Sequence, residues 1–248
     1  MKGDSVKKIV IGNLKTTMDF EETNNYLEII NKEFFDSRVV ICPTSIYISY
    51  FLGNGYQVGL QNTFLEEGGP YTGEVLPSQA ISMGIKYTII GHSERRKHLN
   101  EKDKLINKKV IAAIKHNLKV VLCVGETLEE REMLKTDLVL RRQLINALDG
   151  LTSEMLDNVI IAYEPVWAIG TNKVASNNDI EQTANYLKMI IKQKYDYDDI
   201  RVIYGGSVNH NNIKTLNQIK SISGFLVGGA STNPKKFLTI INEVIAKQ

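Results

Sequence analysis

The side chains of this sequence that could do chemistry directly follow short apolar runs. Glu164 comes immediately after the run Val159–Tyr163, which is typical of a buried strand. A carboxylate at the edge of an apolar core costs free energy unless it has a partner or a task. His92 and Lys15 follow other apolar runs in the same way. If the ends of these runs meet, they bring a carboxylate, an imidazole and a cation together without metal-ligand spacing, in a set suited to moving a proton.

The elements that must position these side chains can be read from the apolar pattern. Eight short runs rich in Val, Ile and Tyr predict strands near residues 8–12, 38–42, 56–61, 87–91, 119–125, 158–164, 201–206 and 224–229. Segments with helical periodicity lie between them, as in residues 176–193, where apolar side chains recur on one face. Ser176 with Asp179, and Asp19 with Glu22, have the spacing of helix-capping pairs.

The alternation of strands and helices predicts the fold. Strands that are buried on both faces and separated by helices indicate a parallel sheet, because each parallel connection needs a crossover. Eight such units predict one closed (β/α)8 barrel. We expect a single domain over residues 1–248, because no Pro/Gly/Ser-rich linker or low-complexity block divides the chain. An open doubly wound sheet is the main alternative, but "IGNLKTTMD" after the first strand lacks a glycine-rich phosphate turn, which speaks against a dinucleotide or NTP site.

A barrel brings the carboxyl ends of all its strands to one face, so residues far apart in sequence can surround one pocket. The polar residues and glycines at these ends are Asn13, Lys15, Gln61, Asn62, His92, Glu94, Glu126, Glu164, Ser207, Gly228 and Gly229. "YGGSV" and "VGGAS" place paired glycines after the last two strands, where unhindered N–H groups can point at an anion. Paired glycines also occur in ordinary turns, so their position in these two loops carries the argument.

Composition excludes several classes of partner. Thirty basic and twenty-eight acidic side chains give a formal net charge of +2, with no long run of one sign, so we expect neither nucleic acid nor membrane as a partner. The two cysteines form no metal-ligand cluster with the four scattered histidines and no disulfide framework. The first residues lack a signal peptide pattern, and no stretch is long enough to cross a bilayer. We therefore expect a cytoplasmic protein without a metal.

Six motifs give the sequence a family resemblance. "GNLK", "GHSERR", "CVGET", "AYEPVWAIGT", "YGGSV" and "GFLVGGAS" occur in the order and at the strand positions of the triosephosphate isomerases, over essentially the whole chain. The chain resembles this family closely. The resemblance implies a TIM barrel that interconverts dihydroxyacetone phosphate and D-glyceraldehyde 3-phosphate through an enediol, as a homodimer, with no metal or organic cofactor.

The resemblance also implies roles for individual residues. Glu164 resembles the catalytic base, His92 the electrophile and Lys15 the electrostatic clamp, with Asn13 and Glu94 in support. Because His92 precedes a predicted helix, whose positive end disfavours the imidazolium, we expect it to act as a neutral donor.

The expected substrate-binding residues are Asn13 and Lys15 with Gly170, Ser207, Gly228 and Gly229. Gly170 lies in "AIGT", within a loop whose ends "PVW" and "KVA" resemble the hinges of a lid over Glu164, with Trp167 as an anchor. The phosphate would sit against glycine backbone in the loops after the last two strands.

Each of these residues has an ordinary structural alternative. Glu164 could cap a helix or pair with a cation, and Lys15 could be a solvated lysine at a strand end. A packed or surface position suits His98, His116 and His210 better than it suits His92.

The segment "LEEGGPYTGEVLPSQ", residues 65–79, is long for a loop in a compact domain, and such loops are usually functional or held by a partner. It resembles the family's interdigitating loop, which implies a homodimer contact through Tyr71, Thr72, Gly73 and Glu74. A surface loop with no partner is the alternative.

Two positions depart from the family pattern, and two other functions compete. Leu14 stands where the family tends to carry tryptophan, and Asn172 where glycine is frequent. The competing functions are a phosphate-binding barrel acting on a larger sugar or an indole-type substrate, and a catalytically silent barrel that serves as a binding protein. A coupled assay with glyceraldehyde 3-phosphate separates them.

Overall fold

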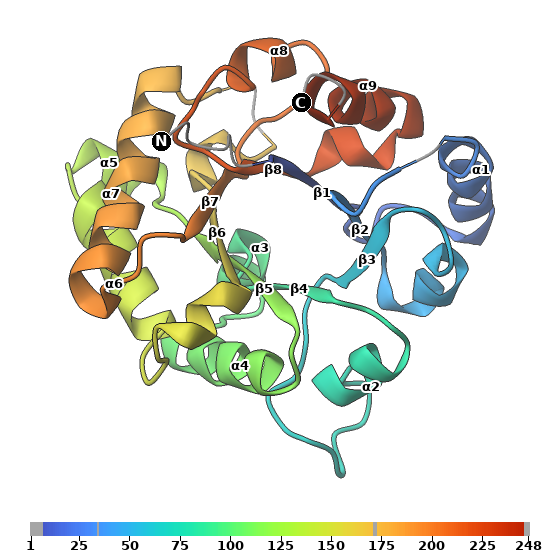
Figure 1. The fold of residues 1–248 in the computed structure, drawn as a ribbon, viewed down its shortest axis with the longest axis horizontal. Coiled ribbons are helices and arrows are strands. Elements are labelled where there is room, and N and C mark those ends of the chain that lie inside the picture. Colours follow the sequence, from blue (N-terminus) through green and yellow to red (C-terminus); the bar gives the residue numbers. More distant parts are fainter. Residues whose placement is uncertain (1–6, 34, 171–172, 246–248) are drawn as a thin grey trace, which may run out of the picture.

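The strands form a closed parallel barrel, seen end-on in Figure 1. The structure is a computed structural model that describes residues 7–33, 35–170 and 173–245. Within these ranges the strands follow one another around the barrel in chain order, and β1 closes the ring by pairing with β8. They are β1 (Ile9–Asn13), β2 (Val39–Cys42), β3 (Gln57–Leu60), β4 (Tyr87–Ile90), β5 (Lys119–Val124), β6 (Val159–Tyr163), β7 (Arg201–Tyr204) and β8 (Gly224–Val227). The strand predictions and the (β/α)8 barrel are confirmed, and the open sheet is excluded.

Helices surround the strands on the outside of the barrel (Figure 1). The α-helices are α1 (Phe20–Ile30), α2 (Pro77–Ser82), α3 (Ser93–His98), α4 (Asp103–Lys115), α5 (Leu128–Glu132), α6 (Thr136–Ala147), α7 (Asn177–Tyr195), α8 (Ile213–Leu216) and α9 (Pro234–Ile245). Short 3-10 helices are η1 (Ser45–Phe51), η2 (Glu154–Asn158), η3 (Val166–Ala168) and η4 (Gly229–Thr232).

The two predicted capping pairs set the starts of α1 and α7. The Asp19 side chain accepts a hydrogen bond from the Glu22 N–H at 2.9 Å, and the Glu22 carboxylate accepts from the Asp19 N–H at 3.0 Å. Ser176 and Asp179 form the same reciprocal arrangement at the start of α7. Each box satisfies backbone donors that the first helical turn leaves free, so local sequence fixes where these helices begin.

The core has two parts because each strand alternates its side chains between two sides. The cluster inside the barrel consists of Ile9, Ile11, Val40, Cys42, Tyr87, Ile89, Val121, Cys123, Ile160, Ala162, Ile203 and Leu226. A larger cluster, which includes Val10, Ile41, Ile161 and Phe225, lies between the strands and the helices. The interior is therefore filled by side chains, and the ends of the strands are held rigidly.

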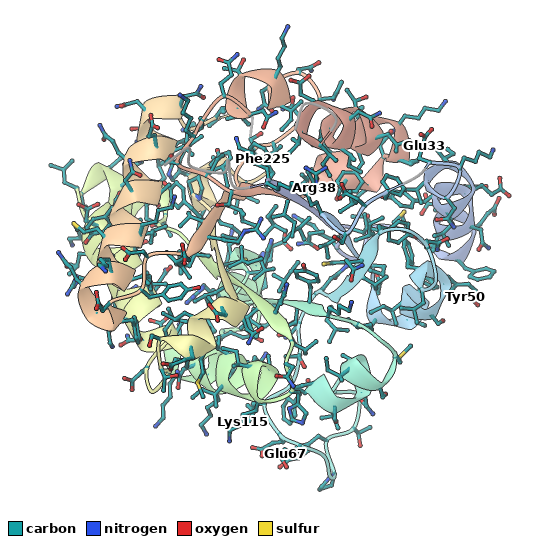
Figure 2. All side chains as sticks on the ribbon, viewed as in Figure 1. Glu33, Arg38, Tyr50, Glu67, Lys115 and Phe225 are labelled. Carbon is teal, nitrogen blue, oxygen red and sulfur yellow. The ribbon has the colours of Figure 1, made fainter. Side chains whose placement is uncertain are left out.

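The loop between β3 and α2 extends away from the barrel, and Figure 2 shows Glu67 on its projecting part. Its base is fixed by hydrogen bonds from Phe64 N and Thr63 Oγ1 to the Val75 carbonyl, at 2.9 and 3.1 Å. No helix in the described chain is long and apolar enough to cross a membrane.

Candidate active site

The carboxyl ends of the strands enclose a pocket of about 230 Å³. Its walls include nearly every residue that sequence reasoning selected for catalysis and substrate binding. They are Asn13, Lys15, His92, Glu164, Gly170, Ser207, Gly228 and Gly229, joined by Ile169, Gly205, Gly206, Val208, Asn209, Leu226 and Ala230. The barrel therefore brings residues from both ends of the sequence together at one site. We refer to this space as the catalytic pocket.

Glu164 and His92 are in direct contact. Glu164 Oε1 lies 3.2 Å from His92 Nε2, and only 2% of Glu164 and 6% of His92 is exposed. The Ser93 N–H donates to Glu164 Oε2 at 3.3 Å. The backbone of Glu164 is fixed by its own N–H, which donates to the Val124 carbonyl at 2.8 Å. A buried carboxylate is thus held at the strand end with its charge partly compensated.

The position of His92 favours one tautomer. His92 is the N-cap of α3, and its Nδ1 accepts a hydrogen bond from the Glu94 N–H at 3.3 Å. A ring nitrogen that accepts a hydrogen bond carries no proton, so in the neutral ring the proton is on Nε2, facing Glu164. This geometry presents an N–H donor to the catalytic pocket.

The two groups shift each other's pKa in opposite directions. Burial lowers the pKa of His92, but the charge of Glu164 and its hydrogen bond raise it, and the net direction is upward. Burial raises the pKa of Glu164, but the His92 imidazole and the Ser93 N–H lower it, and the net direction is downward. The expectation for His92 considered only the helix end and left out the carboxylate opposite, which raises the pKa of His92. Glu164 is therefore ionised and able to accept a proton.

Lys15 is held in an unusual backbone conformation. Its φ of 52° lies in the left-handed region, which costs free energy for a residue with a side chain. Hydrogen bonds to its carbonyl come from Thr44 Oγ1 at 2.8 Å and Gln61 Nε2 at 2.6 Å, and its N–H donates to Asn13 Oδ1 at 3.1 Å. Its ammonium group pairs with Glu94. These contacts hold the cation at the mouth of the barrel.

The glycines of the last two loops allow close approaches. A Cβ atom on Gly205 would lie 2.9 Å from Glu164 Cγ, so this glycine makes room for the carboxylate. A Cβ atom on Gly228 would lie 3.6 Å from Lys15 Cε, which places the lysine side chain beside the backbone of this loop. A cation next to exposed backbone N–H groups forms a site for an anion.

The loop after Glu164 is anchored through the only tryptophan. Trp167 Nε1 donates to Glu126 Oε1 at 2.9 Å, and the same oxygen accepts from the Tyr163 hydroxyl at 3.1 Å. The Arg131 guanidinium lies 4.8 Å from the centroid of the Trp167 ring. Gly170, with a φ of 65°, reaches the catalytic pocket from this loop. Asn172, the predicted departure in the loop, lies outside the described residues.

Sequence reasoning selected most of this site but not all of it. Glu94 does not line the catalytic pocket; it pairs with Lys15 and lines an adjoining hollow. Glu126 was recognised only as a strand-end residue, and its role as a buried acceptor for Trp167 was missed. Leu226 and Asn209 also line the catalytic pocket without having been selected, and the inward position of Leu226 on the last strand was the available signal. Among the described residues, no group of three or more His, Cys, Asp or Glu is placed to hold a metal ion.

Comparison with known proteins gives the same identification over the whole barrel. The family model for triosephosphate isomerase matches residues 8–244. The triosephosphate isomerase of Alkaliphilus oremlandii is 41% identical over 245 residues, covering 95% of this chain and 99% of its own. That of Clostridium botulinum (strain Okra / Type B1) is 40% identical over 243 residues, covering 94% and 98%. That of Dictyoglomus thermophilum is 40% identical over 245 residues, covering 95% and 98%. With its barrel, its strand-end residues and these relatives in agreement, the chain belongs to the triosephosphate isomerase family.

Proposed function

We propose that the chain interconverts dihydroxyacetone phosphate and D-glyceraldehyde 3-phosphate, with Glu164 as the base, His92 as the oxygen-directed donor and Lys15 as the electrostatic clamp. One observation carries this assignment of residues: an ionised carboxylate and an imidazole N–H face each other at 3.2 Å in the catalytic pocket, beside a lysine and unhindered glycine backbone.

The reaction moves one proton between adjacent carbons. Glu164 removes a proton from the carbon next to the carbonyl, and the electron pair left behind forms the carbon–carbon double bond of an enediolate. The negative charge moves to the former carbonyl oxygen, which then gains a proton. Glu164 then returns its proton to the former carbonyl carbon. The hydroxyl group on the carbon that was first deprotonated loses its proton at the same time, and the new carbonyl forms on that carbon. A substrate carbonyl positioned between Glu164 and His92 would replace their direct contact.

The enediolate needs donors that are already oriented. His92 Nε2–H supplies a hydrogen bond, and the Lys15 ammonium supplies charge, so negative charge on oxygen is stabilised without reorganisation of water. Asn13 supports the Lys15 backbone, and Glu94 pairs with its ammonium group. The substrate phosphate would bind at Ser207, Gly228 and Gly229, with Gly170 closing over it.

The size of the catalytic pocket favours a small substrate. Its volume of about 230 Å³ is below the roughly 300 to 1,000 Å³ typical of sites for larger ligands. This supports a triose phosphate over a larger sugar or an indole-type substrate. The paired Glu164 and His92 argue against a silent binding protein, for which a buried ionisable pair would be a cost without a function.

A coupled assay tests the proposed function directly. Purified protein is mixed with D-glyceraldehyde 3-phosphate, and the dihydroxyacetone phosphate formed is reduced by a coupling enzyme with NADH. We expect rapid NADH consumption that depends on the protein. Binding of D-glyceraldehyde 3-phosphate without turnover would support the silent barrel. If the protein neither bound nor converted this compound, the triose phosphate would be excluded as its substrate.

We further propose that two copies form the enzyme through the loop after β3. A second hollow of about 260 Å³ opens on the outer side of the catalytic pocket, and its walls include Asn13, Lys15, His92 and Glu94. The predicted contact residues Tyr71, Thr72, Gly73 and Glu74 are all exposed on the projecting loop. A partner's loop inserted into this hollow would order Lys15 and Glu94 from the outside.

Exposed apolar side chains on the segments after neighbouring strands support such a contact. Exposed apolar side chains lie on the loops and short helices that follow the second, third and fourth strands. They are Ile46, Tyr50, Tyr71, Ile81, Met83 and Leu99, and Figure 2 shows Tyr50 at the outer edge of this region. Contacts of this kind are buried in homodimers, whose interfaces are more apolar than the remaining surface.

A cytoplasmic site of action completes the proposal. The family's reaction belongs to glycolysis and gluconeogenesis, and both Cys42 and Cys123 are buried free thiols, as a reducing compartment allows. Secretion into an oxidising space, tested by fractionation of the producing cells, would contradict it.

A further inference from the structure

A further cavity, larger than the catalytic pocket, is lined by residues that flank His92 and Glu164 in sequence. It has a volume of about 540 Å³ and is lined by residues of α3, α4, α5 and α6 and of the segments that precede these helices. Its walls are formed by Ser93, Arg96, Lys97, Glu101, Lys102, Asp103, Gly125, Thr127, Glu130, Arg142, Gln143 and Val166. None of these residues lines the catalytic pocket. We call this space the hinge cavity.

Two residues that line the hinge cavity, Ser93 and Gly125, also lie against the proposed base. The Ser93 N–H donates to Glu164 Oε2 at 3.3 Å, and a Cβ atom on Gly125 would lie 1.7 Å from the Glu164 carbonyl oxygen. The buried Gln143 side chain fixes Gly125 by accepting from its N–H at 2.9 Å and donating to its carbonyl at 3.0 Å. A ligand in the hinge cavity would therefore contact residues that also hold Glu164 in place.

The same cavity reaches the start of the lid. Val166 lines it, begins η3, and donates from its N–H to the Glu126 carbonyl at 3.0 Å. Trp167 follows and is anchored to the Glu126 carboxylate. Occupation of the hinge cavity would consequently restrict Val166 and Trp167, the residues at the start of the proposed lid.

The charges around the hinge cavity favour an anion, because each of its carboxylates already accepts at least one hydrogen bond from the protein. Glu101 Oε1 accepts from Arg95 at 2.8 Å and from Lys109 at 2.5 Å, while its buried Oε2 has no hydrogen-bond partner among the described residues. Asp103 pairs with Arg96 at 2.6 Å. The Glu130 carboxylate caps α5 by accepting from the Thr127 N–H at 2.9 Å.

Two of the cations have no such partner. Within the described residues, Lys97 and Lys102 make no ion pair and no side-chain hydrogen bond, and both are exposed at the rim. Arg142 Nε lies 3.9 Å from Asp103 Oδ2, which is at the outer limit of an ion pair, so Arg142 is held weakly. The available charge at the rim is therefore positive.

We propose that the hinge cavity binds a small, multiply charged oxyanion through Lys97 and Lys102, and that its occupation slows turnover by restricting Ser93 and Val166. Its volume exceeds that of the catalytic pocket, 540 against 230 Å³, so it accommodates an anion larger than a triose phosphate. A phosphate compound and a polycarboxylate share the required chemistry, and the experiment separates them. The binding claim is independent of the proposed function, whereas the effect on turnover rests on it.

Binding is tested with the catalytic pocket already occupied. The protein is saturated with 2-phosphoglycolate, whose carboxylate and phosphate mimic the enediolate substrate, and its binding is recorded first. Pyrophosphate or citrate is then titrated in by calorimetry. Failure of 2-phosphoglycolate to bind would count against the proposed function alone. Binding of one further probe molecule per chain would support an anion site in the hinge cavity. The probe that binds more tightly then identifies phosphate or carboxylate as the recognised group.

Matched variants assign the binding to this cavity. In K97Q/K102Q the affinity for the preferred probe should fall at least about tenfold, equivalent to about 1.4 kcal/mol. K104Q/K115Q removes the same charge from α4 without touching the hinge cavity and should change the affinity less than about twofold, as expected for screened surface charges. Equal loss in both variants would mean a general charge effect and would overturn the proposal.

Kinetics test the coupling to Glu164 and the lid. The probe should lower kcat at saturating substrate, and K97Q/K102Q should abolish this effect while keeping its own uninhibited rate. Purely competitive inhibition, with kcat unchanged, would place the probe in the catalytic pocket and overturn the proposal. So would the absence of binding by either probe at about 10 mM, ten times a weak millimolar Kd.

Discussion

Glu164 Oε1 lies 3.2 Å from His92 Nε2, and this contact joins the ends of two strands that are separated in the barrel by β5. The two residues are far apart in the sequence, so only the folded barrel brings their side chains into contact. Pairing of β5 with both β4 and β6 brings the two ends to one level, so the register of the barrel creates the site.

Removing the basicity of Glu164 should abolish most of the activity. Glu164→Gln keeps the shape of the side chain but cannot accept the proton, so we expect kcat to fall by about 10² to 10⁴, the range for a lost general base. Binding of 2-phosphoglycolate should survive. Glu181→Gln, the same change on the exposed face of α7, is the control and should have no effect. If Glu164→Gln kept more than about a tenth of wild-type activity, Glu164 would not be the base.

The titration of His92 should respond to Glu164 with a defined sign. Glu164 raises the pKa of His92, while burial lowers it. Glu164→Gln removes the largest raising influence and leaves burial, with the smaller opposing effects of Glu94 and Lys15, so the pKa of His92 should fall. The ring resonances of His92, followed by NMR across pH 4 to 9 in the wild type and in Glu164→Gln, would measure this. An unchanged His92 pKa would show that the two groups are not coupled.

The barrel could be predicted from the sequence because the patterns that indicate its strands and helices are local. Each strand is a short apolar run, and capping pairs such as Ser176 and Asp179 mark helix starts, so order and type of element follow directly. The barrel then implies that strand-end residues converge. Lys15, His92 and Glu164 belong to the set of strand-end residues selected on that basis, and the family resemblance then implied their individual roles.

Other features depend on distances that no sequence pattern encodes. Glu126 follows its strand just as Glu164 does, yet its carboxylate turns to Trp167 and Tyr163 and not to the catalytic pocket. The expectation for His92 considered its helix end but not the carboxylate that lies opposite. The hinge cavity arises where the walls of four helices meet, so it could not be seen before those helices were placed.

A methyl group at Gly205 should displace the base, whereas one at Gly229 should not. The added Cβ of Gly205→Ala would lie 2.9 Å from Glu164 Cγ, while that of Gly229→Ala would have no neighbour within 4 Å. A displacement near 1 Å costs on the order of 10² in rate, so kcat should fall by about 10- to 100-fold in Gly205→Ala. Gly229 lies where the substrate phosphate is proposed to bind, so Gly229→Ala should raise KM but change kcat by less than about threefold. Circular dichroism and thermal unfolding confirm that both fold. Equal kcat values in the two variants would contradict the close packing of Gly205 against the base.

Shortening the lid should separate binding from protection of the intermediate. Deletion of residues 169–173 removes Gly170 from the catalytic pocket but leaves the barrel intact. The variant should bind 2-phosphoglycolate weakly and let the enediolate lose phosphate, so that methylglyoxal forms, because water is no longer excluded. Colorimetric detection of methylglyoxal during turnover measures the leak. Normal inhibitor binding without any methylglyoxal would refute the role of the loop as a lid.

The contact between subunits should be sensitive to a single charge at the tip of the loop after β3. Thr72 is exposed in the isolated chain, and in the proposed dimer it would be inserted beside Asn13 and Lys15 of the second copy. Thr72→Arg would bury an unpaired charge next to a lysine, which is strongly unfavourable, so we expect monomers with much reduced activity. Gln182→Arg adds the same charge on the exposed face of α7 and should stay dimeric and active. Sedimentation velocity over a wide concentration range, combined with assays at each concentration, distinguishes the outcomes. A wild-type protein that is monomeric at micromolar concentration and still fully active would show that assembly does not order Lys15.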